Sequence, residues 1–104
     1  MIRKPARKES VDERAASKHW RKLGYLELKI EKCNHGGWPD RWYCSKALGV
    51  KFWCEWKAIG REPEGQQPIR HRELREQGEI VIVAHSTAEF WEQVRRMQDP
   101  CNGL

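Results

Sequence analysis

A chain of 104 residues has the length of one small domain. Hydrophobic residues make up 38% and charged residues 34%, which is polar for a globular protein, although six tryptophans supply large pieces for a core. The formal charge of +5 suggests a polyanionic partner such as nucleic acid. No apolar run approaches the length of a membrane span, so we expect no membrane partner.

The ends of the chain and its cysteines give further expectations. Residues 1–8 carry four basic side chains and a proline, which is typical of a flexible basic arm. A single domain is expected over residues 9–98, followed by a tail at 99–104. The four cysteines form no CxxC pair, which argues against a zinc ribbon. With no secretory signal in front of them, we expect reduced cysteines in a cytoplasmic protein of a bacterial or phage-infected cell.

The first predicted element is a helix from about Glu9 to Leu23, ended by Gly24. Helical spacing places Ala16, Trp20 and Leu23 on one face. Two acids, Glu9 and Glu13, fall at the edge of this face. They are either functional carboxylates or solvated acids that the helix dipole favours.

Three strands are predicted next, over 25–30, 40–45 and 50–58, with a loop at 33–39 that contains Gly36-Gly37. In the first strand Leu26, Leu28 and Ile30 point to one side, and the residues between them point to the other. In the third strand Phe52, Cys54 and Trp56 suit a core, while Trp53, Glu55 and Lys57 share the opposite face.

The rest of the chain predicts a helix, a strand and a helix. Pro68 suits the first turn of a helix that runs to about Gln77, and Gly78 closes it. Residues 79–84 form a buried strand, and Ser86 with Glu89 predicts the capped start of a helix that runs to about Met97. The fold class is therefore α/β, in the order α-β-β-β-α-β-α. An antiparallel meander followed by a parallel crossover gives a mixed sheet flanked by helices.

One group of side chains points to metal chemistry. If the second and third strands pair, Asp40 meets Glu55 near an end of the sheet. Two adjacent carboxylates repel each other unless a cation lies between them, and Mg²⁺ or Mn²⁺ prefers such oxygen ligands. A lysine in the position of Lys57 can orient an attacking water or offset charge on a phosphoryl oxygen. From spacing alone, Glu55 and Lys57 could equally be an exposed charge pair.

The ordered set of motifs resembles the virus-type replication-repair nuclease (VRR-NUC) family of the PD-(D/E)xK superfamily, which has a restriction-endonuclease-like core. The matching segments are Gly37-Trp38-Pro39-Asp40-Arg41, Phe52 to Lys57, and Gln67 with Leu74 and Gly78. That family has an early helical Glu, then G-x-P-D, then E-x-K, then a Gln about ten residues on. The resemblance covers roughly residues 9–90.

The resemblance implies a role for each matching residue. Asp40 and Glu55 would bind the metal with the carbonyl of Trp56, and Lys57 would position the attacking water. Gln67 would support the site or contact a phosphate, which a helix N-terminus also favours. Glu9 matches the early family acid best, with Glu13 as the alternative one turn later.

Other side chains are candidates for contacts with nucleic acid. Lys29, Arg41, Arg70 and Arg72 could each meet a phosphate, or each could belong to a solvated face. His71, one helical turn after Gln67, could contact nucleic acid or could be structural. Trp53 stands where family members usually carry an aliphatic residue, so it either packs or stacks on a base, and we favour packing. Trp38 and Trp42 flank Asp40, and one of them could lie in a DNA cleft.

The expected function is a metal-dependent DNA endonuclease that is selective for four-way junctions or branched DNA. Family members of this size are expected to be homodimers, whose two sites can cut paired strands. Two alternatives stay open. One is a nucleic-acid-binding module with the same fold and no catalysis, and the other is a toxin-like or regulatory domain that binds a protein.

Overall fold

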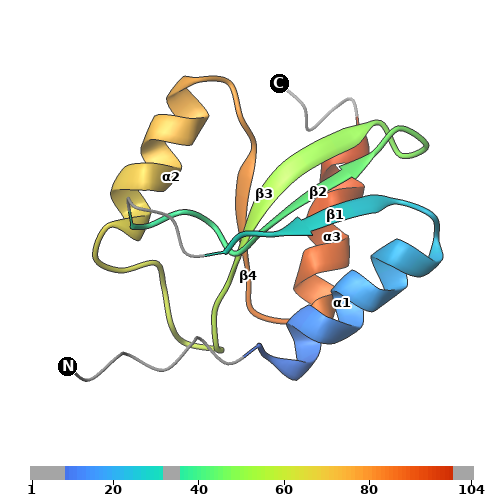
Figure 1. Cartoon of the computed structure of the whole chain (residues 1–104), viewed down its shortest axis with the longest axis horizontal. Helices are drawn as coiled ribbons and strands as arrows, with labels where there is room; N and C mark the ends of the chain where they lie inside the picture. The colour runs from blue at the N-terminus through green and yellow to red at the C-terminus, as the bar shows by residue number, and fades with distance from the viewer. Residues whose placement is uncertain (1–8, 32–35, 100–104) are drawn as a thin grey trace.

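A computed structural model describes residues 9–31 and 36–99 and confirms the predicted order of elements (Figure 1). Within these ranges the elements are α1 Val11–Lys22, β1 Leu26–Lys29, β2 Arg41–Ser45, β3 Val50–Trp56, α2 Gln67–Glu76, β4 Val81–Ala84 and α3 Thr87–Gln98. The predicted basic arm lies outside the described residues, as does all of the predicted tail except Asp99. None of the described helices is long and apolar enough to cross a bilayer.

The strands form one mixed sheet in the order β1-β2-β3-β4. β1, β2 and β3 pair antiparallel in sequence, and β4 joins β3 in parallel after the chain has passed through α2. The predicted meander and parallel crossover are therefore both confirmed. Strand pairs that are parallel need such a crossover, because the chain must return to the same end of the sheet.

The core lies between the sheet and the pair α1 and α3, which lie together on one side of it, with α2 on the other side (Figure 1). Phe52, Cys54 and Trp56 of β3 are all buried there, as their alternation predicts. Trp20 of α1 is fully buried, and its ring meets those of Tyr43, Phe52 and Phe90 edge to face. Burial also raises the pKa of the Cys54 thiol, which keeps that thiol protonated and unreactive.

The first helix is shorter than predicted at both ends. Its N-cap is Ser10, whose hydroxyl accepts a hydrogen bond from the Glu13 N–H at 3.0 Å, so Glu9 precedes the helix. At the other end Leu23 is the C-cap and is 48% exposed, because the chain turns away at Gly24 with a φ of 84°. Leu23 therefore does not share the burial of Ala16 and Trp20, although helical spacing placed the three on one face.

The second face of the sheet is only partly covered. α2 packs on β4, whereas β1 leaves its apolar side chains in solvent, with Leu26 64% exposed and Leu28 56% exposed. The side chain of Glu27, between them, is only 10% exposed because it points to the helix-covered side. The alternation predicted for this strand is correct, but its apolar side chains lie on the solvent-exposed face of the sheet.

The remaining boundaries differ by one or two residues. β3 ends at Trp56 rather than at residue 58, and β4 begins at Val81 rather than at residue 79. α2 begins one residue before Pro68, and Gly78 follows it with a φ of 87°. Ser86 caps α3 by accepting the Glu89 N–H at 3.1 Å, as predicted, but the Glu89 carboxylate contacts His85.

Candidate active site

Asp40 and Glu55 face each other across the β2–β3 pair. The register pairs Arg41 with Cys54, so one step further along the ladder sets Asp40 opposite Glu55. Both residues have the strand parity of Trp42 and Trp53, which places them on the side of the sheet away from the core. The sheet therefore brings the two predicted carboxylates together at the point where β2 begins.

The carboxylate of Asp40 is also tied to the main chain of β3. Its Oδ2 accepts a hydrogen bond from the Trp56 N–H at 2.7 Å. In a β-strand the N–H and C=O of one residue point to the same side, so the Trp56 carbonyl shares the edge of β3 that Asp40 meets. The three predicted oxygen donors thus lie around one end of the β2–β3 ladder.

Glu55 is almost completely buried, with 1% of its surface exposed, because α2 covers it. The Gln67 amide Nε2 lies 3.4 Å from Glu55 Oε2, and the His71 Nε2 lies 3.2 Å from Glu55 Oε1. Gln67 also accepts the Glu64 N–H at 2.9 Å through its Oε1, which sets the direction of its amide. α2 therefore reaches both oxygens of the Glu55 carboxylate.

The loop before Asp40 packs against the start of α2. Gly37 has a φ of 89°, and a Cβ built on it would lie 2.6 Å from the Gln66 carbonyl carbon. Real Cβ atoms essentially never come within 3.0 Å of such an atom, so only glycine fits here. The glycine of the G-x-P-D motif thus lets the Asp40 segment approach the helix that carries Gln67.

Lys57 follows β3 on the same side of the sheet as Glu55. Its N–H donates to the Ala84 carbonyl at 3.0 Å, which continues the β3–β4 ladder by one residue and sets the direction of its side chain. The side chain is partly exposed. The backbone of Lys57 is therefore fixed by the sheet, while its ammonium group is accessible to a molecule that approaches through solvent.

These residues fit a hard divalent cation. No group of three or more His, Cys, Asp and Glu side chains in the described ranges is arranged to hold a metal. A cation at this point would have two carboxylates and the Trp56 main-chain carbonyl as its predicted donors. Mg²⁺ in proteins keeps several waters and often takes only one or two carboxylates, so a sparse oxygen set of this kind suits it. The buried Glu55 carboxylate opposite Asp40 gives the charge that a cation would offset.

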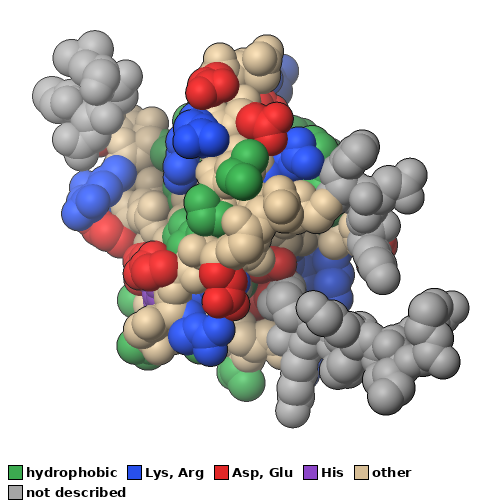
Figure 2. All heavy atoms as spheres, turned by 90° about the vertical axis from the view of Figure 1, so that its left-hand side faces the viewer, with side chains coloured by type: hydrophobic (Ala, Val, Ile, Leu, Met, Phe, Trp, Pro, Cys, Tyr) green, Lys and Arg blue, Asp and Glu red, His purple; other side chains and the backbone are tan. Residues whose placement is uncertain are grey.

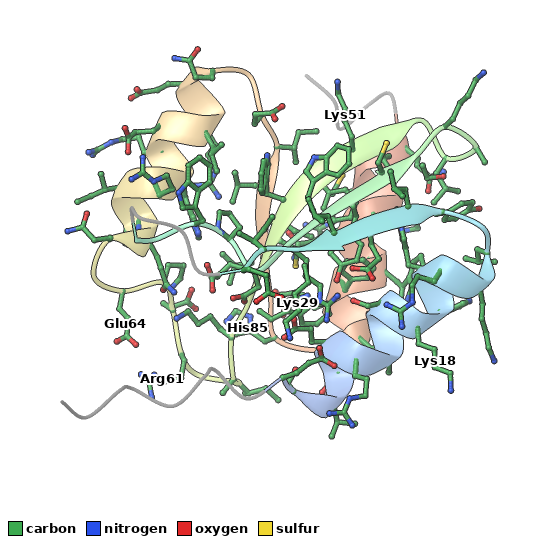
Figure 3. All side chains as sticks on the ribbon, viewed as in Figure 1. Lys18, Lys29, Lys51, Arg61, Glu64 and His85 are labelled. Carbon is green, nitrogen blue, oxygen red and sulfur yellow. The ribbon has the colours of Figure 1, made fainter. Side chains whose placement is uncertain are left out.

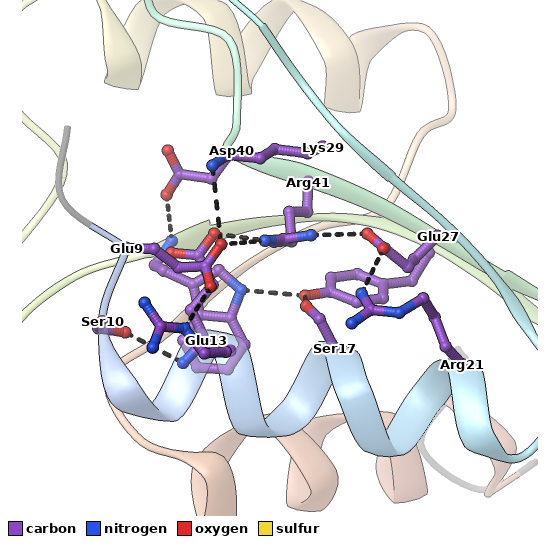
Figure 4. Close-up of polar contacts among 12 residues, drawn as sticks. Glu9, Ser10, Glu13, Ser17, Arg21, Glu27, Lys29, Asp40 and Arg41 are labelled. Carbon is purple, nitrogen blue, oxygen red and sulfur yellow. Dashed lines mark hydrogen bonds and ion pairs between the residues drawn. The ribbon is translucent and has the colours of Figure 1, made fainter. Parts of the chain in front are cut away.

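Arg41, predicted to contact DNA, is instead the centre of a buried ion-pair cluster (Figure 4). It is 4% exposed and binds Glu9 at 2.5 Å, Glu13 at 2.8 Å and Glu27 at 2.7 Å. The prediction was wrong because Arg41 shares the strand parity of buried Tyr43, so its side chain points to the helix side of the sheet. Its neighbour Asp40 points to the other side.

Of the two candidate acids, Glu13 lies within α1, and it is fully buried. Glu9, predicted as the helical acid, lies before the helix and contacts Arg41, Arg14 at 3.1 Å and Lys29 at 3.7 Å. Although its partial burial acts in the opposite direction, the hydrogen bond from Arg14 and the charges of Arg41 and Lys29 lower the pKa of Glu9. Glu9 is therefore ionised and held beside the segment that carries Asp40 (Figure 4).

Of the two roles expected for His71, the structure agrees with a structural one and contradicts a contact with nucleic acid. Its side chain is 2% exposed and points to Glu55, so it cannot reach a phosphate without rearrangement of α2. Burial lowers the pKa of His71, as do the charges of Arg75 and Lys57, while Asp40 acts in the opposite direction. The imidazole is therefore held in its neutral form.

Two other predicted cations lie near the surface. The side chain of Lys29, labelled in Figure 3, is 44% exposed, and its Nζ lies 3.7 Å from Glu9 Oε2 (Figure 4). The Arg70 guanidinium lies 4.9 Å from the ring centre of Trp38 and pairs with Glu73 at 3.1 Å. On the face shown in Figure 2, the described basic and acidic side chains are intermixed rather than gathered into one basic patch. Contact of either residue with nucleic acid stays a prediction.

Trp53 packs, as favoured. Its ring centre lies 5.9 Å from that of Trp38, and its Nε1–H donates to Glu79 at 3.2 Å. Both rings are partly exposed and form one aromatic layer with Arg70 on the side of the sheet that carries Glu55.

Two parts of the site escaped the sequence analysis: the contact of His71 with Glu55 and the ion pairs of Arg41. Each had a signal. His71 is four residues after Gln67, so both point the same way from one helix. Arg41 alternates with Asp40, so the two cannot share a face.

Comparison with known proteins supports the fold. Neither the family models nor the curated proteins compared with the sequence match it. Among solved structures, the chain is similar to one described as a VRR_NUC domain, with a TM-score of 0.64 and 26% sequence identity. The match covers 81% of this chain and 86% of the other.

Proposed function

Because the chain belongs to the VRR-NUC family, whose fold is that of a nuclease domain, we propose that it is a metal-dependent endonuclease that hydrolyses phosphodiester bonds in DNA. The observation that supports this most is the meeting of Asp40 with Glu55 beside the Trp56 main chain, with Lys57 on the same side. The positive charge of the chain agrees with a polyanionic substrate.

In this proposal Asp40, Glu55 and the carbonyl of Trp56 hold Mg²⁺ or Mn²⁺. When bound, the cation supplies Lewis-acid stabilisation of a phosphoryl oxygen and lowers the pKa of water. The Lys57 ammonium group orients the attacking water and offsets the charge that develops in the transition state. Gln67 supports Glu55 through its amide, and Lys29 and Arg70 contact backbone phosphates.

We further propose that the substrate is branched DNA, such as a four-way junction, and that the protein acts as a homodimer. The exposed Leu26 and Leu28 of β1 lie on the partly uncovered face of the sheet, which a second copy could bury. A twofold axis would then relate two active sites, as symmetric cleavage of paired strands requires.

Cleavage of labelled DNA tests the activity. A four-way junction and a linear duplex of the same sequence are incubated with the protein in Mg²⁺, in Mn²⁺ and in a chelator. We expect metal-dependent cleavage of the junction that is lost in Asp40→Ala and Lys57→Ala. Lys51→Ala is the matched control, since Lys51 is exposed at the far end of the same strand. Salt-sensitive binding of DNA with no cleavage in either metal would instead support a non-catalytic module.

Light scattering coupled to gel filtration tests the dimer. We expect twice the mass of the 12.4 kDa chain for the natural protein. The double variant Leu26→Asp with Leu28→Asp should be a monomer, whereas Val11→Asp should not change the mass, since Val11 is exposed at the start of α1. A monomer in the natural protein would contradict the dimer and leave the metal chemistry untouched.

A further inference from the structure

His71 is a buried polar side chain that the proposed chemistry does not use. It lies one helical turn after Gln67 in α2, with 2% of its side chain exposed. Its Nε2 faces Glu55 Oε1 at 3.2 Å. A buried imidazole loses its contacts with water, so its placement is favourable only where a partner satisfies the ring nitrogen.

The contact with Glu55 is one half of a pair. Gln67 approaches Glu55 Oε2 at 3.4 Å, and the Glu64 N–H fixes its amide in that direction. Two donors from one helix therefore address the two oxygens of one carboxylate. A carboxylate that is held at both oxygens cannot rotate about its last bond, and each oxygen still has a lone pair for a cation.

The neighbouring residues show why this carboxylate needs orientation. Asp40 is held by the Trp56 N–H, which belongs to the rigid ladder of the sheet. Glu55 has a longer side chain with more rotatable bonds, and its orienting contacts come from α2, on the other side of a loop. The plane of the Glu55 carboxylate therefore depends on the position of α2.

We propose that His71 is a positioning residue that fixes the Glu55 carboxylate in the orientation that binds the divalent cation. This rests on the proposed function of Glu55 as a metal ligand. Removal of a group that orients a metal ligand by a hydrogen bond typically lowers the metal affinity by roughly 10–100-fold. His71 acts through Glu55 and does not touch the substrate.

The test is calorimetric titration of the protein with Mn²⁺ alone, without DNA, on three variants. His71→Leu fills the space without a donor, and we expect its Mn²⁺ affinity to fall by roughly 10–100-fold. His71→Gln can place an amide N–H near the position of the imidazole Nε2, so its affinity should stay within a few-fold of the natural value. His71→Asn is polar but too short to reach Glu55, so it should resemble His71→Leu. Glu76→Gln, exposed at the end of α2, is the control.

The order of the variants decides the outcome. If His71→Leu and His71→Asn bind Mn²⁺ like the natural protein, or if His71→Gln loses as much affinity as they do, the positioning role is overturned. If His71→Leu fails to fold, as judged by circular dichroism, the Mn²⁺ affinities of His71→Gln and His71→Asn still test the positioning role. If the natural protein binds no Mn²⁺ and cleaves no DNA, the proposed function fails, and the role of His71 fails with it. A natural protein that binds Mn²⁺ while all variants match it overturns only the role of His71.

A second readout separates positioning from packing. In cleavage assays the Mn²⁺ concentration for half-maximal rate should rise in His71→Leu by the same factor as the dissociation constant. The rate at saturating Mn²⁺ should fall much less, because excess metal selects the competent orientation of Glu55. Equal half-saturation in both proteins would contradict the proposal.

Discussion

Gly37 lies directly against the main-chain carbonyl of Gln66, and this contact joins the loop before Asp40 to the start of α2. The proposed active site draws on both segments, because Asp40 comes from one and Gln67 from the other. Any side chain at residue 37 must push them apart, since a Cβ would lie 2.6 Å from the Gln66 carbonyl carbon. The distance between the two halves of the site therefore depends on one glycine.

We predict that Gly37→Ala lowers both stability and activity. The positive φ costs a non-glycine residue about 1–3 kcal/mol, and a shift of α2 of about 1 Å can cost roughly 100-fold in rate. Chemical unfolding and junction cleavage measure the two effects. Gly36→Ala is the matched control, because its Cβ would meet nothing closer than 3.9 Å. Equal behaviour of the two variants would show that α2 can move without consequence.

The β3 strand shows what local pattern can predict. Alternation alone placed Phe52, Cys54 and Trp56 in the core and Glu55 on the other side, because the direction of a side chain in a strand is fixed by its parity. The meeting of Asp40 with Glu55 followed from the pairing of two consecutive strands, which is the usual arrangement.

The sequence could not predict contacts that depend on how helices pack on the sheet. Arg41 was interpreted as a phosphate contact or as part of a solvated face, and unpaired arginines are indeed rarely buried. Its burial requires acids from both α1 and β1, and their approach is a property of the assembled fold. The spacing of Gln67 and His71 places both on one side of α2, but the contact of His71 with Glu55 also depends on where the crossover places that helix.

Divalent metal should stabilise the fold if Asp40 and Glu55 bind it. Binding to the folded state alone adds about 2.7 kcal/mol at a metal concentration one hundred times the dissociation constant. For a domain of this size, each 1 kcal/mol raises the melting temperature by roughly 4–8 °C. We therefore expect Mn²⁺ to raise the melting temperature of the natural protein and a chelator to reverse the effect.

Asp40→Asn is the informative variant for this measurement. It keeps the size of the side chain and an oxygen that can accept the Trp56 N–H, but it removes the charge that attracts the cation. We expect its melting temperature to be insensitive to Mn²⁺. An equal rise in both proteins would locate the stabilising metal elsewhere in the chain.

Removal of the Arg41 guanidinium should destabilise the protein severely. Arg41→Met removes the guanidinium that pairs with the fully buried Glu13 carboxylate, and breaking a buried ion pair in this way typically costs about 3–5 kcal/mol. Arg21→Ala is the control. It removes the ion pair between Arg21 and Glu27. Because the Arg21 side chain is 52% exposed, this loss should lower the free energy of unfolding by less than about 1 kcal/mol. Urea unfolding measures both, and a small loss in Arg41→Met would mean that the acids of the cluster take up protons or water without penalty.

His85 should make stability depend on pH. Figure 3 labels His85 and Arg61. The His85 Nε2 lies 2.8 Å from the Arg61 carbonyl, and its Nδ1 lies 3.1 Å from the Glu89 carboxylate, so both ring nitrogens face acceptors. A neutral imidazole has only one N–H, so this geometry favours the charged form. The hydrogen bond to the Arg61 carbonyl, then that to Glu89, and the nearby charge of Glu62 raise the pKa of His85 above its ordinary 6.5.

The sign follows from linkage between protonation and folding. A raised pKa means that the folded state binds the proton more tightly, so the contribution is complete below pH 6.5 and is lost as the pH rises through the folded value. The lowered pKa of His71 acts in the opposite sense, since its contribution is lost as the pH falls below 6.5.

The difference in free energy of unfolding between the natural protein and His85→Gln isolates the contribution of His85. We expect the free energy of unfolding of the natural protein to fall relative to that of His85→Gln as the pH rises above 6.5. In Glu89→Gln, the free energy of unfolding should fall less over the same pH range than it does in the natural protein. Parallel curves for the natural protein and His85→Gln would mean that His85 does not tie the β3–α2 loop to α3.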